Sequence, residues 1–393
     1  MLNLAHFSFD EAIRESFKDV YRLTDAETAV AVLLSSGTIV DEIADLRGVS
    51  QQTVRSQIKA IKSKTHVRDL PDLVRLLCGF SLSIAMPTPQ KEQTAEGRPA
   101  EPSLHVLHLP DGRSLNYLIQ GDPDGRPVLL FHDLPHGLQL PRAAIRYARR
   151  HKLKLVAPIR PGFGGSVPLP DCSDAAYLHQ VVSDTFDLCE ALAINQAKLL
   201  GVGSGATFAT CFAARFPDKM SGIVMVGHAP MWRPERLDRM PAYLRLLVQL
   251  TRHMPELANV VAGAILASIS RHDHRTFAKE ACNGSPSDLQ TLDDAELTAL
   301  MDHEIKIALK SDPRTLAREW GLLAADLSQQ AKLLPHTMHL LHGAEDRVLV
   351  PDFSRQFADA VPQTKLQIIN DAGHCLFHSH WQCILDTLLI QSK

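Results

Sequence analysis

The sequence predicts two unlike folded parts, a small all-α unit followed by an α/β unit with a mainly parallel sheet flanked by helices. Apolar residues recur at helical spacing before residue 85, whereas short β-branched runs appear after residue 104. Between them lies MPTPQKEQTAEGRPAEPS, a segment rich in proline and polar residues that is typical of a linker. We therefore place the helical unit at 1–85, the linker at 86–103 and the α/β unit at 104–393.

The composition indicates a folded protein that is not a general polyanion binder. Of the 393 residues, 45% are hydrophobic, enough for a sizeable core, and the formal net charge is −3. The seven cysteines are scattered without the paired Cys/His spacing of zinc sites, and no run of about 18 apolar residues occurs. We expect a cytoplasmic protein with no metal and no cofactor.

The first part contains successive segments with apolar residues at helical spacing. Thr24 precedes the first segment and Glu27 follows three residues later, which is the pattern of a capping box. A short helix, the turn around Gly48 and a helix that opens at Ser50 predict a helix-turn-helix, whose second helix can enter the major groove of DNA. The apolar positions are Ala29, Val32, Leu33, Ile39, Ile43, Ala44, Val54, Ile58, Ile61, Leu73, Val74 and Leu77.

The second helix of this motif carries an excess of positive charge. From Val49 to Arg68 there are five basic residues and no acidic one. Glutamine and arginine near the helix start fit base edges, and the lysines further along fit phosphates. A solvated basic helix in a protein-interaction domain is the alternative interpretation. The predicted DNA contacts are Gln51, Gln52, Thr53, Arg55, Ser56, Lys59 and Lys62, with Lys64 as a further phosphate contact.

The run from Leu23 to Leu77 resembles the LuxR-type (GerE-like) DNA-binding domain. It keeps the Leu-Thr-x-x-Glu opening, the Ile43-Ala44 pair, the Gly48-Val49-Ser50 turn and Thr53-Val54-Arg55. The resemblance implies a four-helix fold that binds double-stranded DNA at an inverted-repeat operator. It also implies a homodimer.

The second part contains short β-branched runs, most of the later ones separated by amphipathic helical stretches. Strands that alternate with helices predict a mainly parallel sheet covered on both faces. The predicted strands are LHVLHLP, RSLNYLIQ, VLLFH, LKLVAPI, AKLLGV, GIVMVG, TMHLLHG and KLQIIND.

The order of motifs in this part resembles the α/β-hydrolase fold. VLLFHDLPHG resembles the strand and loop that carry one oxyanion-hole N–H, although the usual His-Gly is here His132-Asp133. APIRPGFGGS resembles the next loop of a hydrolase group that reads RPGFG. The resemblance places Asp346 as the acid and His374 as the base of a catalytic triad. It also implies that a helical insert at about 230–330 is a cap over the pocket.

The segment LLGVGSGATF occupies the position of the nucleophile elbow, where a nucleophile sits on a sharp turn between small residues. Relatives of this type read GVSGGA, so the serine and a glycine are exchanged. Counting forward to FAARFPD places Gly203 in the nucleophile position and Ser204 one residue later. One residue further along a helix is rotated by about 100°, which predicts that the Ser204 oxygen points away from the base.

Three interpretations follow. The site is inactive and retains a ligand pocket; or the turn is rebuilt so that Ser204 reaches His374; or the domain is only a spacer or dimerisation body. Cys211 and Cys375 are poorer nucleophile candidates because neither lies on the elbow. The predicted ligand-binding residues are His132, Asp133, Gly203, Ser204, His374 and Trp232.

Together the two parts predict a one-component transcriptional regulator. In this hypothesis the α/β unit is not an enzyme but binds a small organic ligand without turning it over. The alternative is an active serine hydrolase, an esterase, lactonase or C–C hydrolase, which uses the displaced Ser204 and is fused to a DNA-binding domain.

Overall fold

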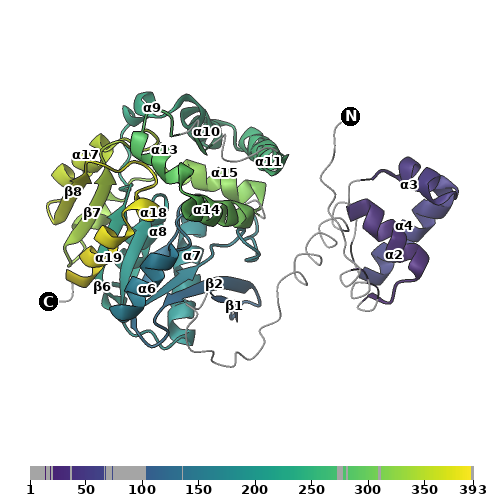
Figure 1. Cartoon of the computed structure of the whole chain (residues 1–393), viewed down its shortest axis with the longest axis horizontal. Coiled ribbons are helices and arrows are strands. Elements are labelled where there is room, and N and C mark those ends of the chain that lie inside the picture. Colours follow the sequence, from purple (N-terminus) through teal and green to yellow (C-terminus); the bar gives the residue numbers. More distant parts are fainter. Residues whose placement is uncertain are drawn as a thin grey trace. The chain divides into compact units, whose positions relative to one another are not determined.

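The computed structural model divides the chain into two compact units, Met1–Arg98 and Pro99–Lys393 (Figure 1). It describes residues 21–35, 38–65, 103–134, 136–271, 282–308 and 311–390, together with residues 14, 18, 67, 73, 278 and 279. The predicted linker lies outside these residues except for Ser103. Among the described residues, no helix is both long and apolar enough to cross a membrane.

The first unit is helical in its described part, with α2 at Asp25–Ser35, α3 at Val40–Arg47 and α4 at Gln51–Thr65. The predicted capping box is present, since Glu27 Oε2 accepts the Thr24 N–H at 2.6 Å and Thr24 Oγ1 accepts the Glu27 N–H at 3.2 Å. Gly48 ends α3 with a φ of +62°, a conformation that glycine adopts without strain. The fourth predicted helix lies outside the described residues except for Leu73, which is buried.

The second unit contains a sheet of eight described strands in the order β1-β2-β4-β3-β5-β6-β7-β8. β1 and β2 are antiparallel to their neighbours, and the remaining pairs are parallel. This confirms the predicted mainly parallel sheet. The bounds are Ser103–His108, Ser114–Gly121, Arg126–Phe131, Leu153–Pro158, Ala197–Val202, Met220–Val226, Met338–Gly343 and Thr364–Ile369.

Helices cover both faces of this sheet because alternate residues of the central strands face opposite ways. On one face, Leu129 and Phe131 pack in a core with α7 (Asp174–Ala191), α8 (Gly205–Arg215) and Phe357 of α17 (Asp352–Ala360). On the other face, Val128 and Leu130 pack with α6 (Arg142–Arg150) and α19 (Trp381–Ile390). The short elements η1 (Pro217–Lys219) and α18 (Leu376–Ser379) connect them to neighbouring strands.

Between β6 and β7 the described chain is helical, as the predicted insert at 230–330 requires. Its helices lie together above the sheet in the view of Figure 1. The loop after β4 is joined to α15 by a fully buried ion pair between Arg160 and Glu319. The insert contains α9 (Arg236–Arg239), α10 (Ala242–His253), α11 (Pro255–Arg271), α13 (Pro286–Asp293), α14 (Ala295–Ala308), α15 (Pro313–Leu322) and α16 (Ser328–Lys332).

Candidate active site

The turn from β5 to α8 is packed so closely that glycine is required at alternate positions. A Cβ on Gly201 would lie 2.7 Å from Ala206 Cα, and one on Gly205 would lie 2.0 Å from the Phe131 carbonyl oxygen. Between them Gly203 has a φ of +50° and donates its N–H to the Val226 carbonyl at 2.8 Å. Gly203 therefore occupies the sharp turn at the carboxyl end of β5, where a nucleophile elbow presents its reactive side chain.

Ser204 lies in the first turn of the following helix rather than on the elbow. Its backbone is helical, with φ −56° and ψ −24°, and its carbonyl accepts the Thr207 N–H. Its Oγ is buried and has no hydrogen-bond partner among the described residues. The turn is thus not rebuilt to join Ser204 Oγ to His374, because Gly203 holds the left-handed conformation that the elbow needs.

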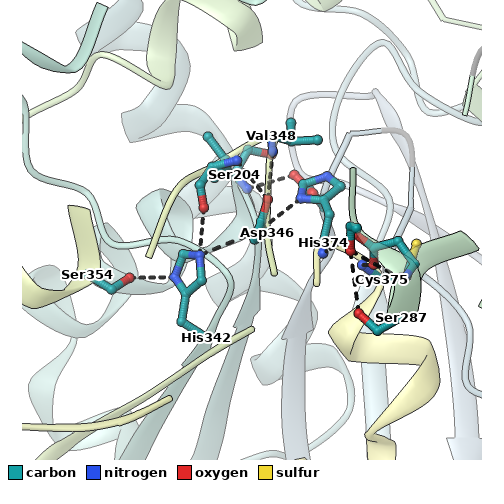
Figure 2. A network of polar contacts seen from close by, with 12 residues as sticks. Ser204, Ser287, His342, Asp346, Val348, Ser354, His374 and Cys375 are labelled. Carbon is teal, nitrogen blue, oxygen red and sulfur yellow. Dashed lines mark hydrogen bonds and ion pairs between the residues drawn. The ribbon is translucent and has the colours of Figure 1, made fainter. Parts of the chain in front are cut away.

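The predicted acid and base are paired in the structure. Asp346 follows β7 and His374 follows β8, and His374 Nδ1 lies 3.2 Å from Asp346 Oδ2 (Figure 2). The other oxygen of Asp346 accepts the N–H groups of Val348 and Leu349, both at 2.8 Å. Parallel strands end at the same edge of the sheet, so both side chains come to the edge that also carries Gly203.

The charges of this pair stabilise each other. Burial opposes ionisation of Asp346, but the charges and hydrogen bonds of His374 and His342 together outweigh it and hold the pKa of Asp346 well below its usual range. Burial also lowers the pKa of His374, yet the Asp346 carboxylate overcomes this effect and raises it to about 10. His374 is therefore protonated at neutral pH in this arrangement.

Two residues that help to position Asp346 and His374 were not predicted from the sequence. His342 lies between Ser354 Oγ at 2.6 Å and the Leu349 carbonyl at 2.6 Å, and it stands 3.5 Å from Asp346 Oδ2 (Figure 2). Asp288 of α13 accepts the backbone N–H of His374 at 2.8 Å and that of Cys375 at 2.7 Å. A carboxylate from the helical insert thus fixes the loop that carries the base.

The remaining predicted ligand-binding residues fall into two groups, those at the elbow and those packed elsewhere. Asp133 lies at the elbow, where its Oδ1 accepts the Ser204 N–H at 2.7 Å. His132 is buried, and burial and the nearby Arg160 hold its pKa well below its usual value. Trp232 packs in a hydrophobic cluster with Met240 and under the Arg252 guanidinium. His132 and Trp232 are therefore assigned to packing, and His374, Asp133, Gly203 and Ser204 to the site.

The cysteines considered as alternative nucleophiles are chemically unsuited to that role. Burial raises the pKa of Cys211 to about 12. The pKa of Cys375 is raised well above its usual value, first by a hydrogen bond with Cys282 and then by burial. Nucleophilic attack requires the thiolate, so both thiols are inert at neutral pH.

In the first unit most of the predicted DNA-contacting residues are exposed along α4. Lys64 is bound to Glu27 at 2.7 Å and to the Arg22 carbonyl at 3.1 Å, so a phosphate would have to compete with these partners. Lys62 is half-buried. The exposed members are Gln51, Gln52, Thr53, Arg55, Ser56 and Lys59.

Comparison with known proteins shows that this chain is similar in sequence to hydrolases. The 2-hydroxymuconate semialdehyde hydrolase of Pseudomonas sp. is 27% identical over 226 residues, covering 56% of this chain and 70% of that protein. The pimeloyl-[acyl-carrier protein] methyl ester esterase of Chromobacterium violaceum is 27% identical over 270 residues, covering 68% of this chain and 94% of that protein.

A solved structure shares the same fold. The 2-hydroxy-6-oxo-6-phenylhexa-2,4-dienoate hydrolase from Rhodococcus superposes with a TM-score of 0.52 at 18% identity, covering 74% of this chain and 99% of that chain.

These relatives correct two expectations from the sequence. The hypothesis of a one-component regulator is wrong, since the proteins similar to this chain are hydrolases and esterases. The hypothesis that the α/β unit is not an enzyme is wrong for the same reason. The second error came from interpreting the exchange at Gly203 and Ser204 as a loss of chemistry, and the first from combining that interpretation with the resemblance to a DNA-binding domain. Residues 126–380 match the alpha/beta hydrolase fold, and the chain belongs to this family.

Proposed function

We propose that the second unit is a hydrolase that cleaves esters, lactones or carbon–carbon bonds next to a carbonyl group. The observation that carries this proposal is the Asp346–His374 pair at the carboxyl edge of the sheet. Its imidazole is only half-buried, so its second nitrogen remains available for proton transfer with a substrate or water. The similarity to an ester hydrolase and to a semialdehyde hydrolase supports these substrate classes.

The pair alone does not supply an attacking atom. Ser204 is the nucleophile in the sequence-based alternative, and its buried, unpaired Oγ at the start of α8 is the observation in its favour. Its helical backbone and the lack of a hydrogen bond to His374 among the described residues argue against it. We therefore assign proton transfer to His374, whose charge Asp346 stabilises, and do not assign the attack to Ser204.

For the first unit, double-stranded DNA remains the proposed partner, as the resemblance to LuxR-type domains implies. The support is the exposed face of α4 that carries Arg55 and Lys59. In this proposal DNA binding localises a hydrolase and does not respond to a ligand. A homodimer and a cytoplasmic location remain predictions on the same basis.

The proposal that the second unit is a hydrolase is tested by measuring turnover of a defined substrate panel by the full-length protein. The panel contains p-nitrophenyl acetate and butyrate, an aromatic lactone and 2-hydroxymuconate semialdehyde. We expect turnover of at least one class by the wild type and a loss of about 100-fold or more in His374→Gln, because general acid–base catalysis contributes about 10²–10⁴-fold. Absence of turnover in every class, or equal turnover in His374→Gln, would overturn the proposal.

A further inference from the structure

The Asp133 carboxylate occupies the place that a nucleophile side chain would take on the elbow. A Cβ on Gly203 would lie 2.0 Å from both Cγ and Oδ2 of Asp133 and 2.3 Å from Oδ1. Side-chain atoms of two residues do not approach so closely. With the Asp133 carboxylate in this position, residue 203 can carry no side chain, so the aspartate at 133 requires the glycine at 203.

This carboxylate is held in a defined position. Its Oδ1 accepts the Ser204 N–H at 2.7 Å, and the backbone N–H of Leu134 also favours its ionised form. The Asp133 backbone is fixed as well, since its N–H donates to the His136 carbonyl at 2.8 Å and its carbonyl lies 2.8 Å from His132 Nδ1. Asp133 is 8% exposed, so its carboxylate is part of the buried elbow.

The charges around His374 and Asp133 favour a proton on His374 and an ionised Asp133 carboxylate. The ionisable groups that act on His374 include Asp346, Cys282 and Asp133. Asp133 interacts in turn with the charges of His374 and of the buried Arg160 guanidinium. Burial raises the pKa of Asp133 above its usual value, which makes the carboxylate a stronger base. His374 holds its proton because its pKa is raised to about 10. Neighbouring groups with separated pKa values are the usual arrangement of a catalytic base and acid.

We infer that Asp133 replaces the missing serine as a catalytic residue, as the general base that removes a proton from an attacking water while His374 donates a proton to the leaving group. This inference rests on the proposed hydrolase function. It reverses the role that the histidine has in a serine triad, where the imidazole is the base.

The reaction balances without a covalent intermediate. For an ester, Asp133 Oδ2 takes one proton from water while the water oxygen bonds to the acyl carbon and the carbonyl electron pair moves to its oxygen. When the tetrahedral intermediate collapses, the bond to the alkoxide breaks and the alkoxide takes the proton from His374. The proton on Asp133 then passes to His374, which leaves one acid, one alcohol and the starting enzyme.

Three comparisons on the full-length protein test the inference. In turnover, Asp133→Asn keeps the shape but loses the base, and we expect its kcat to fall about 100-fold or more. Asp124→Asn is the matched control because that carboxyl is exposed on a turn, and its kcat should be unchanged. With a fluorophosphonate probe, wild type and Gly203→Ser should form no adduct, whereas Asp133→Gly combined with Gly203→Ser should be labelled at position 203.

The outcomes separate this inference from the proposed function. Full turnover in Asp133→Asn, or a wild-type adduct on Ser204, would overturn the role of Asp133 and leave a hydrolase. Labelling of Gly203→Ser alone at the rate of the double variant would show that Asp133 does not fill this position, and would overturn it as well. A wild type without turnover would overturn both proposals.

Discussion

Arg160 and Glu319 form a two-bond ion pair in the interior of the α/β unit. Arg160 Nε and Nη2 lie 2.7 and 2.6 Å from the two carboxylate oxygens, and the side chains are 1% and 0% exposed. The Tyr177 hydroxyl donates to the same carboxylate at 2.7 Å. The pair connects the loop after β4 to α15 and so joins the helical insert to the sheet.

Removing one partner of this pair should be far more damaging than removing both. Glu319→Ala leaves the Arg160 charge buried without its carboxylate, and we expect a loss of about 3–5 kcal/mol in the free energy of unfolding. Combining Glu319→Leu with Arg160→Met should cost less, because no unpaired charge remains. Urea denaturation of the three proteins measures this, and equal losses would show that the ion pair itself carries the stability.

The Asp346–His374 pair predicts a loss of stability at high pH. The folded-state pKa of His374, about 10, is above its ordinary value of 6.5. A raised histidine pKa stabilises the fold fully below pH 6.5, and the contribution is lost as the pH rises through 10. The difference in unfolding free energy between wild type and His374→Gln should therefore shrink from pH 6 to pH 10. A difference that stays constant would mean that no such charge is stabilised.

Asp288 is a positioning residue for the base, because it accepts the backbone N–H groups of His374 and Cys375. Asp288→Ala should lower kcat about 10-fold or more with little change in KM, since misplaced catalytic groups affect the transition state more than binding. Asp293→Ala on the same helix removes only an exposed ion pair with Lys279. If both variants lose kcat equally, the effect comes from α13 as a whole.

DNA binding by the first unit predicts a specific effect of one exposed side chain. Arg55 is exposed on α4, and its removal should weaken binding to a selected duplex about 10-fold or more without changing ester turnover. Lys365→Ala removes the same charge from an exposed position on β8 and should leave DNA binding unchanged. Gel-shift titration at fixed salt measures both. Equal weakening by the two variants would indicate a nonspecific charge effect.

The sequence predicted those features that depend on short-range patterns. The strands follow from short runs of β-branched and other apolar residues, and the Thr24–Glu27 capping box from a three-residue spacing. The pair Asp346 and His374 was found because each residue follows a strand within a known motif. Asp288 and His342 were missed because no local pattern marks a side chain whose partners are brought together by folding.

The role of the elbow was misjudged for a similar reason. The exchange of serine and glycine at 203 and 204 is visible in the sequence, and so is the aspartate at 133. Their contact is not, because the two loops are separated by about 70 residues of chain and meet only when β3 and β5 pair. In our inference the Asp133 carboxylate takes the position of the missing nucleophilic serine, so the exchange replaces one catalytic group by another.

The dependence of kcat/KM on pH, measured from pH 4 to pH 11 with the best substrate of the panel, tests the central claim most directly. With Asp133 as base and His374 as acid, kcat/KM should rise on the acid side, stay level through neutral pH and fall as the pH passes about 10, where His374 loses its proton. Asp133→Asn should remove the acid limb. A kcat/KM that instead rises through pH 10 would show that His374 acts as the base, and would contradict the account.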